Sequence, residues 1–221
     1  MKAVKLKTEY LKNPLGIDIK NPRFMWNCEG GKAQSAYRLI ASDTRGNILW
    51  DSGKVESSQM SFIPYPLDTP SRLRVNWKVK LWDENGLEGE WSEPAFFEIG
   101  LRNASDWSAK WITGNYNVNR KQRYPVDCFK KEFECKKPIS FSIFRAFSLM
   151  AGLNGTDFTM PLAPGITEYR KRIQYQTYDV TALLHEGSNV LCVELADGWY
   201  RGSVGAWGLK NQYGTETKLL A

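Results

Sequence analysis

The stretch from Arg74 to Leu81 constrains the fold of this chain most strongly, because it alternates strictly between apolar and polar residues. In an extended strand, one face would carry Val75, Trp77, Val79 and Leu81, and the other would carry Asn76, Lys78 and Lys80. A period of two predicts a strand with its apolar face in a core and its polar face in water. Asp83-Glu84-Asn85-Gly86 follows, and its Asn-Gly pair is expected to supply the positive φ angles of a tight turn.

Short apolar segments of the same kind recur through residues 1–102. They are Phe24–Trp26, Tyr37–Ala41, Ile48–Trp50, Met60–Ile63 and Phe96–Ile99. Strands of this length and spacing predict a two-sheet β-sandwich of the immunoglobulin or fibronectin type III kind. Trp77, Trp82 and Trp91 are candidates for stacking on a ligand, but their alternating neighbours favour packing in the core.

Residues 103–221 are predicted to form a second all-β domain, an antiparallel sandwich of jelly-roll type. Its candidate strands are Cys128–Phe133, Ile139–Phe147, Ile173–Tyr178 and Val190–Leu195. The last of these is almost continuously apolar, which predicts burial on both faces except at Glu194. Residues 217–221 look like part of a strand, so we expect this domain to be truncated at its C-terminus.

The formal charge of +6 raises the question of an anionic partner. The excess cations lie in short groups beside acids, such as Lys130-Lys131 and Arg170-Lys171-Arg172, which is typical of a solvated surface and not of a nucleic-acid site. Lysines interrupt the first seven residues, and no apolar run reaches signal-peptide or membrane-spanning length. We therefore expect a cytoplasmic protein that binds neither nucleic acid nor membrane.

The residue types that catalysis needs do not form a recognisable set. His185 is the only histidine, which argues against a Ser-His-Asp relay or a histidine-rich metal site. The four cysteines are too irregularly spaced for a zinc site and are expected to be buried thiols. Glycoside hydrolysis needs two carboxyl groups across the scissile bond, and no pair among the 24 acids stands out. We therefore predict no catalytic residue in this chain.

A possible binding surface lies near the carboxyl end, where Asp197-Gly198-Trp199-Tyr200-Arg201-Gly202 is predicted to be a recognition loop. The candidate binding residues are Asp197, Trp199, Tyr200, Arg201, Trp207, Asn211 and Tyr213. A sugar needs hydrogen-bonding partners beside an aromatic plate, and this stretch supplies both. The alternative is that Trp199 and Trp207 only close one end of the sandwich.

Several phrases of the chain resemble those of one enzyme family. In the second half they are Leu162-Ala163-Pro164-Gly165, Tyr178-Asp179-Val180-Thr181 and Asp197-Gly198-Trp199-Tyr200. In the first half they are Glu9-Tyr10-Leu11, residues 13–18, residues 50–53 and Trp91-Ser92, and residues 106–112 resemble the phrase that leads into the family's second domain. The order and spacing of these phrases resemble the N-terminal region of bacterial α-L-rhamnosidases, glycoside hydrolase family 78.

This resemblance implies a non-catalytic role. The family's catalytic acids lie in a downstream helical barrel, so the chain alone is expected to be inactive and to serve as a scaffold and a rhamnose-binding module. Its expected partners are a rhamnose-containing carbohydrate and the remaining domains of the parent enzyme. The alternative is a purely structural module that binds no ligand and docks onto those other domains.

In some family members the equivalent domain binds rhamnose through calcium. The resemblance therefore makes calcium a candidate cofactor, with Asp197, Asn154, Asp157 and Glu168 as candidate ligands and Asn154 also as a sugar contact. Calcium needs about six to eight oxygen ligands, and no calcium-loop spacing supports this set. The strand near residue 149 is also about four residues shorter than the family's, judged from typical strand lengths.

Overall fold

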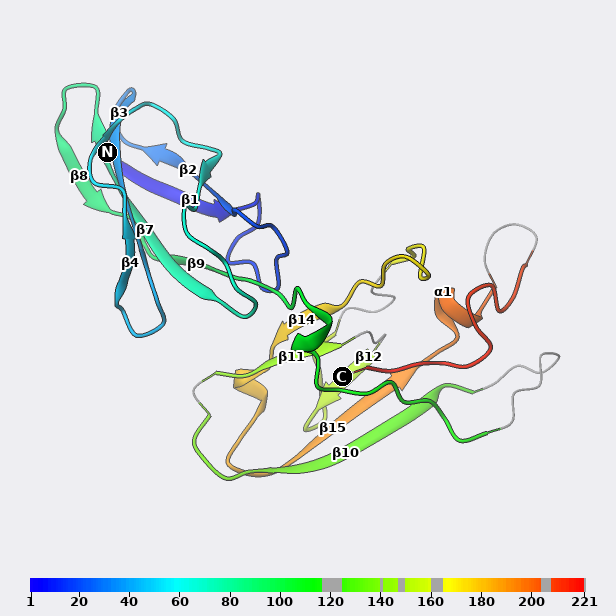
Figure 1. Cartoon of the computed structure of the whole chain (residues 1–221). Coiled ribbons are helices and arrows are strands. Elements are labelled where there is room, and N and C mark those ends of the chain that lie inside the picture. The colour runs from blue at the N-terminus through cyan, green and yellow to red at the C-terminus, as the bar shows by residue number, and fades with distance from the viewer. Residues whose placement is uncertain (117–124, 140, 147–149, 160–164, 204–207, 221) are drawn as a thin grey trace. The chain divides into compact units, whose positions relative to one another are not determined.

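A computed structural model describes residues 1–116, 125–139, 141–146, 150–159, 165–203 and 208–220. The chain divides into two compact units, Met1–Trp107 and Ser108–Ala221 (Figure 1). The sequence places the domain boundary after residue 102, five residues before the division between these units.

The first unit is an antiparallel sandwich. One sheet contains β1 (Lys2–Thr8), β2 (Arg23–Glu29) and β6 (Ile63–Pro64), in the order β1-β2-β6. The other contains β3 (Gln34–Ser42), β4 (Ile48–Asp51), β5 (Val55–Glu56), β7 (Arg74–Asp83), β8 (Glu88–Trp91) and β9 (Ala95–Glu98). Its order is β4-β3-β7-β8, with β5 on β3 and β9 on β7. A 3-10 turn, η1 (Ala104–Asp106), lies near the end of this unit.

The core of this unit lies between the two sheets, and β7 is its central strand. The predicted alternation is confirmed, because Val75, Trp77, Val79 and Leu81 are all at most 1% exposed. Trp77 packs against Phe24 with ring centroids 4.5 Å apart. Trp77 and Trp82 are both buried, as the core interpretation expects. Trp91 is only half-buried, with the Lys78 and Lys80 ammonium groups 4.7 and 4.9 Å from its ring centroid, so the core prediction is wrong for Trp91.

The turn after β7 differs from the prediction in one respect. Gly86 alone has a positive φ, of 76°, and Asn85 does not. The Asp83 carboxylate stabilises the turn by accepting hydrogen bonds from the backbone amides of Asn85 and Leu87, both at 2.9 Å. A side-chain acceptor therefore fixes this turn together with one glycine.

The second unit also contains antiparallel sheets. A four-stranded sheet has the order β10-β15-β12-β13, from β10 (Asp127–Cys135), β15 (Gly187–Leu195), β12 (Met150–Leu153) and β13 (Thr156–Asp157). A two-stranded sheet pairs β11 (Ile143–Ala146) with β14 (Gln176–Asp179). The described helical elements are η2 (Thr181–Leu183) and α1 (Gly198–Arg201). The predicted all-β sandwich class is confirmed, and no described helix has the length and apolar character needed to cross a membrane.

Strand β15 buries one face only. Val193 and Leu195 are 3% and 6% exposed. Cys192 before them and Glu194 between them are exposed to solvent. The prediction that both faces of this strand are buried is therefore wrong, because one face of this antiparallel sheet meets solvent. Cys128, whose neighbour across the ladder is Glu194, is also an exposed free thiol and not a buried one.

Candidate functional site

A pocket of about 330 Å³ opens where β15 ends and α1 begins. Its walls come from four segments of the second unit that are far apart in the sequence. They are Trp111, then Tyr169 and Ile173, then Leu195–Arg201, and finally Thr217 and Lys218. An isolated bridge between Ile112 and Leu219 holds the first and last of these segments side by side.

The predicted recognition loop at residues 197–202 contains a single helical turn, α1 (Gly198–Arg201; Figure 1). Two glycines make this turn. Gly198 has a φ of 48°, and a Cβ on Gly202 would lie 2.3 Å from the Gly198 carbonyl oxygen. The Gly202 amide donates to the carbonyls of Asp197 and Gly198 at 3.2 and 3.1 Å. This tight closure leaves Trp199 42% exposed beside the pocket.

Asp197 and Arg201 form an ion pair across α1. Arg201 is 4% exposed, and its Nε and Nη2 lie 2.6 and 2.5 Å from Asp197 Oδ1. The Asp197 side chain is 40% exposed, and its Oδ2 accepts no hydrogen bond from the described residues. One carboxylate oxygen therefore fixes the helical turn, while the other remains open to a ligand at the pocket wall.

Arg201 also anchors the floor of the pocket to three other segments. It donates from Nη1 to the Tyr116 hydroxyl at 2.5 Å, and that hydroxyl donates to Asp127 Oδ2 at 3.0 Å. The Thr217 hydroxyl donates to the same Asp127 oxygen. Burial opposes the charge on Arg201, but the hydrogen bonds with Tyr116 and Asp197 outweigh it, so the pKa of Arg201 is raised. The guanidinium therefore stays charged inside the protein.

Three tyrosines form an aromatic cluster at the pocket. Tyr169 meets Tyr200 and Tyr213 edge to face, with centroids 5.6 and 4.9 Å apart, and Tyr200 stacks on Tyr213 at 6.2 Å. Burial, with the neighbouring Tyr213, raises the pKa of Tyr169. This contact network joins the 165–172 segment and the 208–214 segment to α1.

The structure gathers most of the predicted binding residues. Asp197, Trp199, Tyr200 and Arg201 line the pocket, and Tyr213 packs behind it. Asn211 contributes through its backbone amide, which donates to the Arg201 carbonyl at 3.0 Å. Trp207 lies outside the described residues.

Asn154 is not among the pocket residues but lies in the β12–β13 turn. Its Nδ2 donates to Leu183 O at 2.9 Å and to Asn189 Oδ1 at 2.8 Å, and its Oδ1 accepts from the Val190 amide at 2.8 Å. Asn189 is fully buried and also bonds the backbone of His185 and Gly187. Asn154 thus holds two turns together, and both protons of its side-chain amide are donated within the protein.

The candidate calcium ligands do not fit a calcium site in the part of the chain that the structure describes. No group of three or more histidine, cysteine, aspartate or glutamate side chains there is placed to hold a metal ion. The Asn154 side chain bonds Leu183, Asn189 and Val190, and the Asp197 carboxylate pairs with Arg201. Glu168 accepts from the amide of Arg170 in its own turn at 3.4 Å, and Asp157 lies on β13 opposite Gly152.

Seven residues of the pocket wall and one of its anchors lie outside the predicted loop and were not among the candidate binding residues. They are Trp111, Tyr169, Ile173, Leu195, Ala196, Thr217, Lys218 and Tyr116. Trp111 lies in the phrase at 106–112, and Tyr169 follows the phrase at 162–165. The sequence phrases at these two positions could therefore have pointed to Trp111 and Tyr169, but the predicted binding surface was drawn mainly from residues 197–213. The contribution of Thr217 and Lys218 depends on the pairing of residue 112 with residue 219, which no local pattern reveals.

This arrangement suits a small ligand with both apolar and hydroxyl faces. Indole, phenol and aliphatic groups make the walls, Asp197 Oδ2 offers an acceptor, and the Lys218 ammonium offers a donor. Small-molecule sites typically combine such walls with a few placed polar groups. The geometry therefore favours binding over chemistry.

Comparison with known proteins matches both units to described domain families. Residues 3–103 match the "Rha78A-like, N-terminal immunoglobulin domain", and residues 149–221 match the "Alpha-L-rhamnosidase N-terminal domain". These two ranges include every residue of β1 to β9 except Lys2, and all of α1.

Curated and solved relatives are much longer than this chain. It is 36% identical over 227 residues to an α-L-rhamnosidase of Formosa agariphila, an alignment that spans 90% of the chain and 23% of that relative. The solved α-L-rhamnosidase of Aspergillus terreus superposes with a TM-score of 0.88 at 27% identity, covering 99% of the chain and 26% of its own. That of Dictyoglumus thermophilum gives 0.78 at 32% identity, covering 98% and 27%. The chain thus spans about a quarter of the relatives that it matches.

Proposed function

The chain belongs to the N-terminal region of the α-L-rhamnosidases, and from this premise we propose that it is the non-catalytic N-terminal part of a longer enzyme that releases terminal α-L-rhamnose from glycosides. The observation that carries this proposal is the match of 90% of the chain to only 23% of a curated relative. A reading frame that continues into a large helical domain would support it. A frame that ends at residue 221 in the intact gene would oppose it.

The pocket at α1 is proposed to hold terminal rhamnose. L-rhamnose is a neutral 6-deoxy sugar, so it offers a methyl group and C–H faces to aromatic walls and hydroxyls to hydrogen-bonding partners. Trp199 would supply the stacking plate, and Asp197 Oδ2 would accept from a ring hydroxyl. Arg201 would act only by positioning, because its guanidinium is buried and bonded to Asp197 and Tyr116.

Titration of the chain with L-rhamnose, followed by calorimetry and by tryptophan fluorescence, tests this role. We expect saturable binding to one site. Trp199→Ala should weaken it at least about fivefold, since an aromatic contact contributes roughly 1 kcal/mol. Trp91→Ala, which removes an indole from the other unit, is the matched control and should leave the affinity unchanged. Absence of any saturable response would leave only the scaffold role.

The non-catalytic part of the proposal needs a separate assay. The chain alone should release no measurable aryl group from an aryl α-L-rhamnoside, whereas the longer protein should turn it over. Turnover by residues 1–221 alone would contradict the proposal.

A second candidate function rests on the apolar rim of the pocket. Trp111, Ile112 and Trp199 are 47%, 48% and 42% exposed, and other domains of the enzyme could cover them. In that case Trp199→Ala would leave rhamnose affinity unchanged and lower the melting temperature of the longer enzyme. The same variant therefore separates a ligand site from a docking surface.

A further inference from the structure

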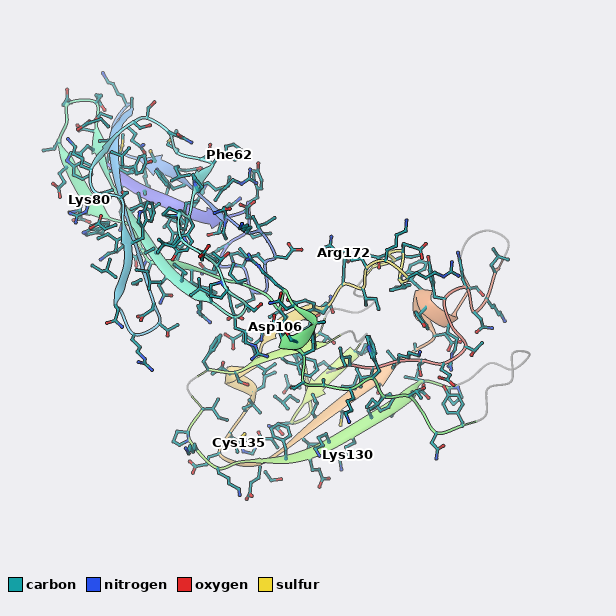
Figure 2. All side chains as sticks on the ribbon, in the orientation of Figure 1. Phe62, Lys80, Asp106, Lys130, Cys135 and Arg172 are labelled. Atoms are coloured by element: carbon teal, nitrogen blue, oxygen red, sulfur yellow. The ribbon has the colours of Figure 1, made fainter. Side chains whose placement is uncertain are left out.

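Exposed cations gather around the mouth of the α1 pocket. Arg170 follows the pocket residue Tyr169, its guanidinium carbon lies 5.7 Å from the Tyr213 ring centroid, and it donates to Gln212 O at 3.3 Å. Lys218 lines the pocket itself. Exposed cations also flank these positions at Lys171, Arg172 and Lys210, and Figure 2 labels Arg172 on the segment that precedes β14. The fold thus brings together charges that are 48 positions apart in the sequence.

The acids of the same segments offset these charges only in part. Asp197 is already paired with the buried Arg201, and residues 165–175 and 208–220 hold five lysines and arginines against two glutamates, Glu168 and Glu216. Lys171, Lys210 and Lys218 form no ion pair with any described carboxylate. Glu216 is the other acid in the segments 165–175 and 208–220, and it is exposed. The pocket mouth therefore carries a positive potential, which concentrates anions there.

We infer that the pocket takes its rhamnose from an acidic glycan, in which the sugar next to the rhamnose carries a carboxylate or a sulfate. The inference rests on the proposed function, since it assumes that rhamnose fills the pocket. Rhamnose itself is neutral and gives the cations no partner. A rhamnose seated between Trp199 and Asp197 would leave the next sugar at the mouth, within reach of the flexible side chains of Arg170 and Lys218.

The same cations could attract any polyanion, but the pocket favours a glycan over a nucleic acid. Nucleic-acid surfaces follow a phosphate backbone with a stripe of cations and exposed stacking rings. Here Lys218 lines, and Arg170 adjoins, a pocket of about 330 Å³, which is in the range of small-ligand sites. Binding of a polyanion without rhamnose is therefore an outcome that the experiment must detect.

The test compares four probes on the full chain at about 20 mM and about 300 mM NaCl. They are rhamnosyl-glucose, rhamnosyl-glucuronate, a rhamnosyl-glucose that carries a sulfate on the glucose, and a rhamnose-free oligogalacturonate. We expect an acidic rhamnoside to bind roughly fivefold tighter than the neutral one at low salt, because two exposed charge pairs contribute about 0.5 kcal/mol each. The preference should shrink at high salt, and comparison of the glucuronate with the sulfate identifies the preferred anion.

Two single-charge variants isolate the role of the exposed cations. Arg170→Gln removes an exposed cation that does not line the pocket, so it should reduce the preference and leave the affinity for rhamnosyl-glucose unchanged. Lys137→Gln removes one charge beyond Cys135, at the end of β10 away from the pocket (Figure 2), and should change nothing. That end is roughly 27 Å from Asp127, given about 3.4 Å per strand residue.

Each outcome decides between the two proposals. Equal affinity for the neutral and acidic rhamnosides would overturn the inference and leave the rhamnose site intact. If the rhamnose-free oligogalacturonate bound as tightly as the acidic rhamnosides, the inference would also be overturned, since the exposed cations would then form a non-specific anion surface. Failure of every rhamnoside to bind would refute the site and the inference together.

Discussion

Arg201 is the residue whose role in the structure differs most from the role predicted from the sequence. Sequence reasoning placed it among the sugar-binding groups because a guanidinium lies beside two aromatics. The structure places it 4% exposed, with its nitrogens bonded to Asp197 and Tyr116. Residue type predicted that position 201 belongs to the site, but the burial that decides its role depends on Tyr116 and Asp127, 85 and 74 positions away.

Glu9 gives the first unit a pH-dependent component of stability. Arg23 donates to both of its carboxylate oxygens, at 2.9 and 2.7 Å, and these bonds lower the pKa of Glu9. A lowered pKa in the folded state stabilises above the ordinary value of about 4.3 and is lost as pH falls through the folded value. Glu9→Gln should therefore cost roughly 2 kcal/mol at neutral pH and progressively less below about pH 4.

Urea unfolding of the two proteins at neutral pH and near pH 3 measures this difference. Glu90→Gln, at an exposed position on β8, is the control and should cost little at either pH. A Glu9→Gln penalty that stays constant as the pH falls would contradict the assignment.

Asn189 is the buried polar residue on which the turns of the second unit depend. It accepts from the His185 amide and the Asn154 side chain, and it donates to the carbonyls of His185 and Gly187. Asn189→Ala should lower the free energy of unfolding by roughly 3 kcal/mol, because these buried groups lose their partner. Ser188→Ala, at the exposed neighbour, should cost less than about 0.5 kcal/mol. Equal effects in thermal unfolding would show that the network contributes nothing.

At the scale of elements, strict alternation was the reliable signal. It predicted β7 and its buried face, because a period of two leaves a strand only one way to face the core. The continuous apolar run of β15 led to the wrong prediction that both of its faces are buried, because the apolar residue Cys192 is in fact exposed. Strand β1 was missed, because lysines fill its outward positions while its inward residues Ala3 and Leu6 join the core.

The helical turn α1 was predicted as a recognition loop because two aromatics, a carboxylate and a guanidinium lie between two glycines. In the structure, the Gly202 amide donates to the Gly198 carbonyl, and a Cβ at position 202 would clash with that oxygen. Gly202→Ala should therefore open α1, displace Trp199 and lower rhamnose affinity at least about tenfold, since a displaced site loses more than one contact. Gly165→Ala is a matched control, because a Cβ there meets nothing within 4 Å. Unchanged affinity in the Gly202 variant would show that α1 does not shape the pocket.

At the scale of the whole molecule, the two units have cores of unequal size. The first has a continuous cluster that includes Phe24, Trp77 and Phe97, whereas the second has a smaller described cluster around Val193 and Leu195. Burial of apolar side chains dominates folding, so the first unit should fold without the second. Residues 1–107 alone should unfold cooperatively within about 5 °C of the upper transition of the full chain. A fragment that fails to fold, or melts far below that transition, would contradict this independence.

We propose that this chain carries a rhamnose pocket and that the hydrolytic centre belongs to the rest of the longer enzyme. A crystal structure of residues 1–221 grown with L-rhamnose tests the pocket most directly. We predict one sugar among Trp111, Tyr169 and Trp199, with a C–H face on the Trp199 ring and a hydroxyl about 2.6–3.2 Å from Asp197 Oδ2. A sugar bound away from α1, or an empty pocket at saturating rhamnose, would contradict it.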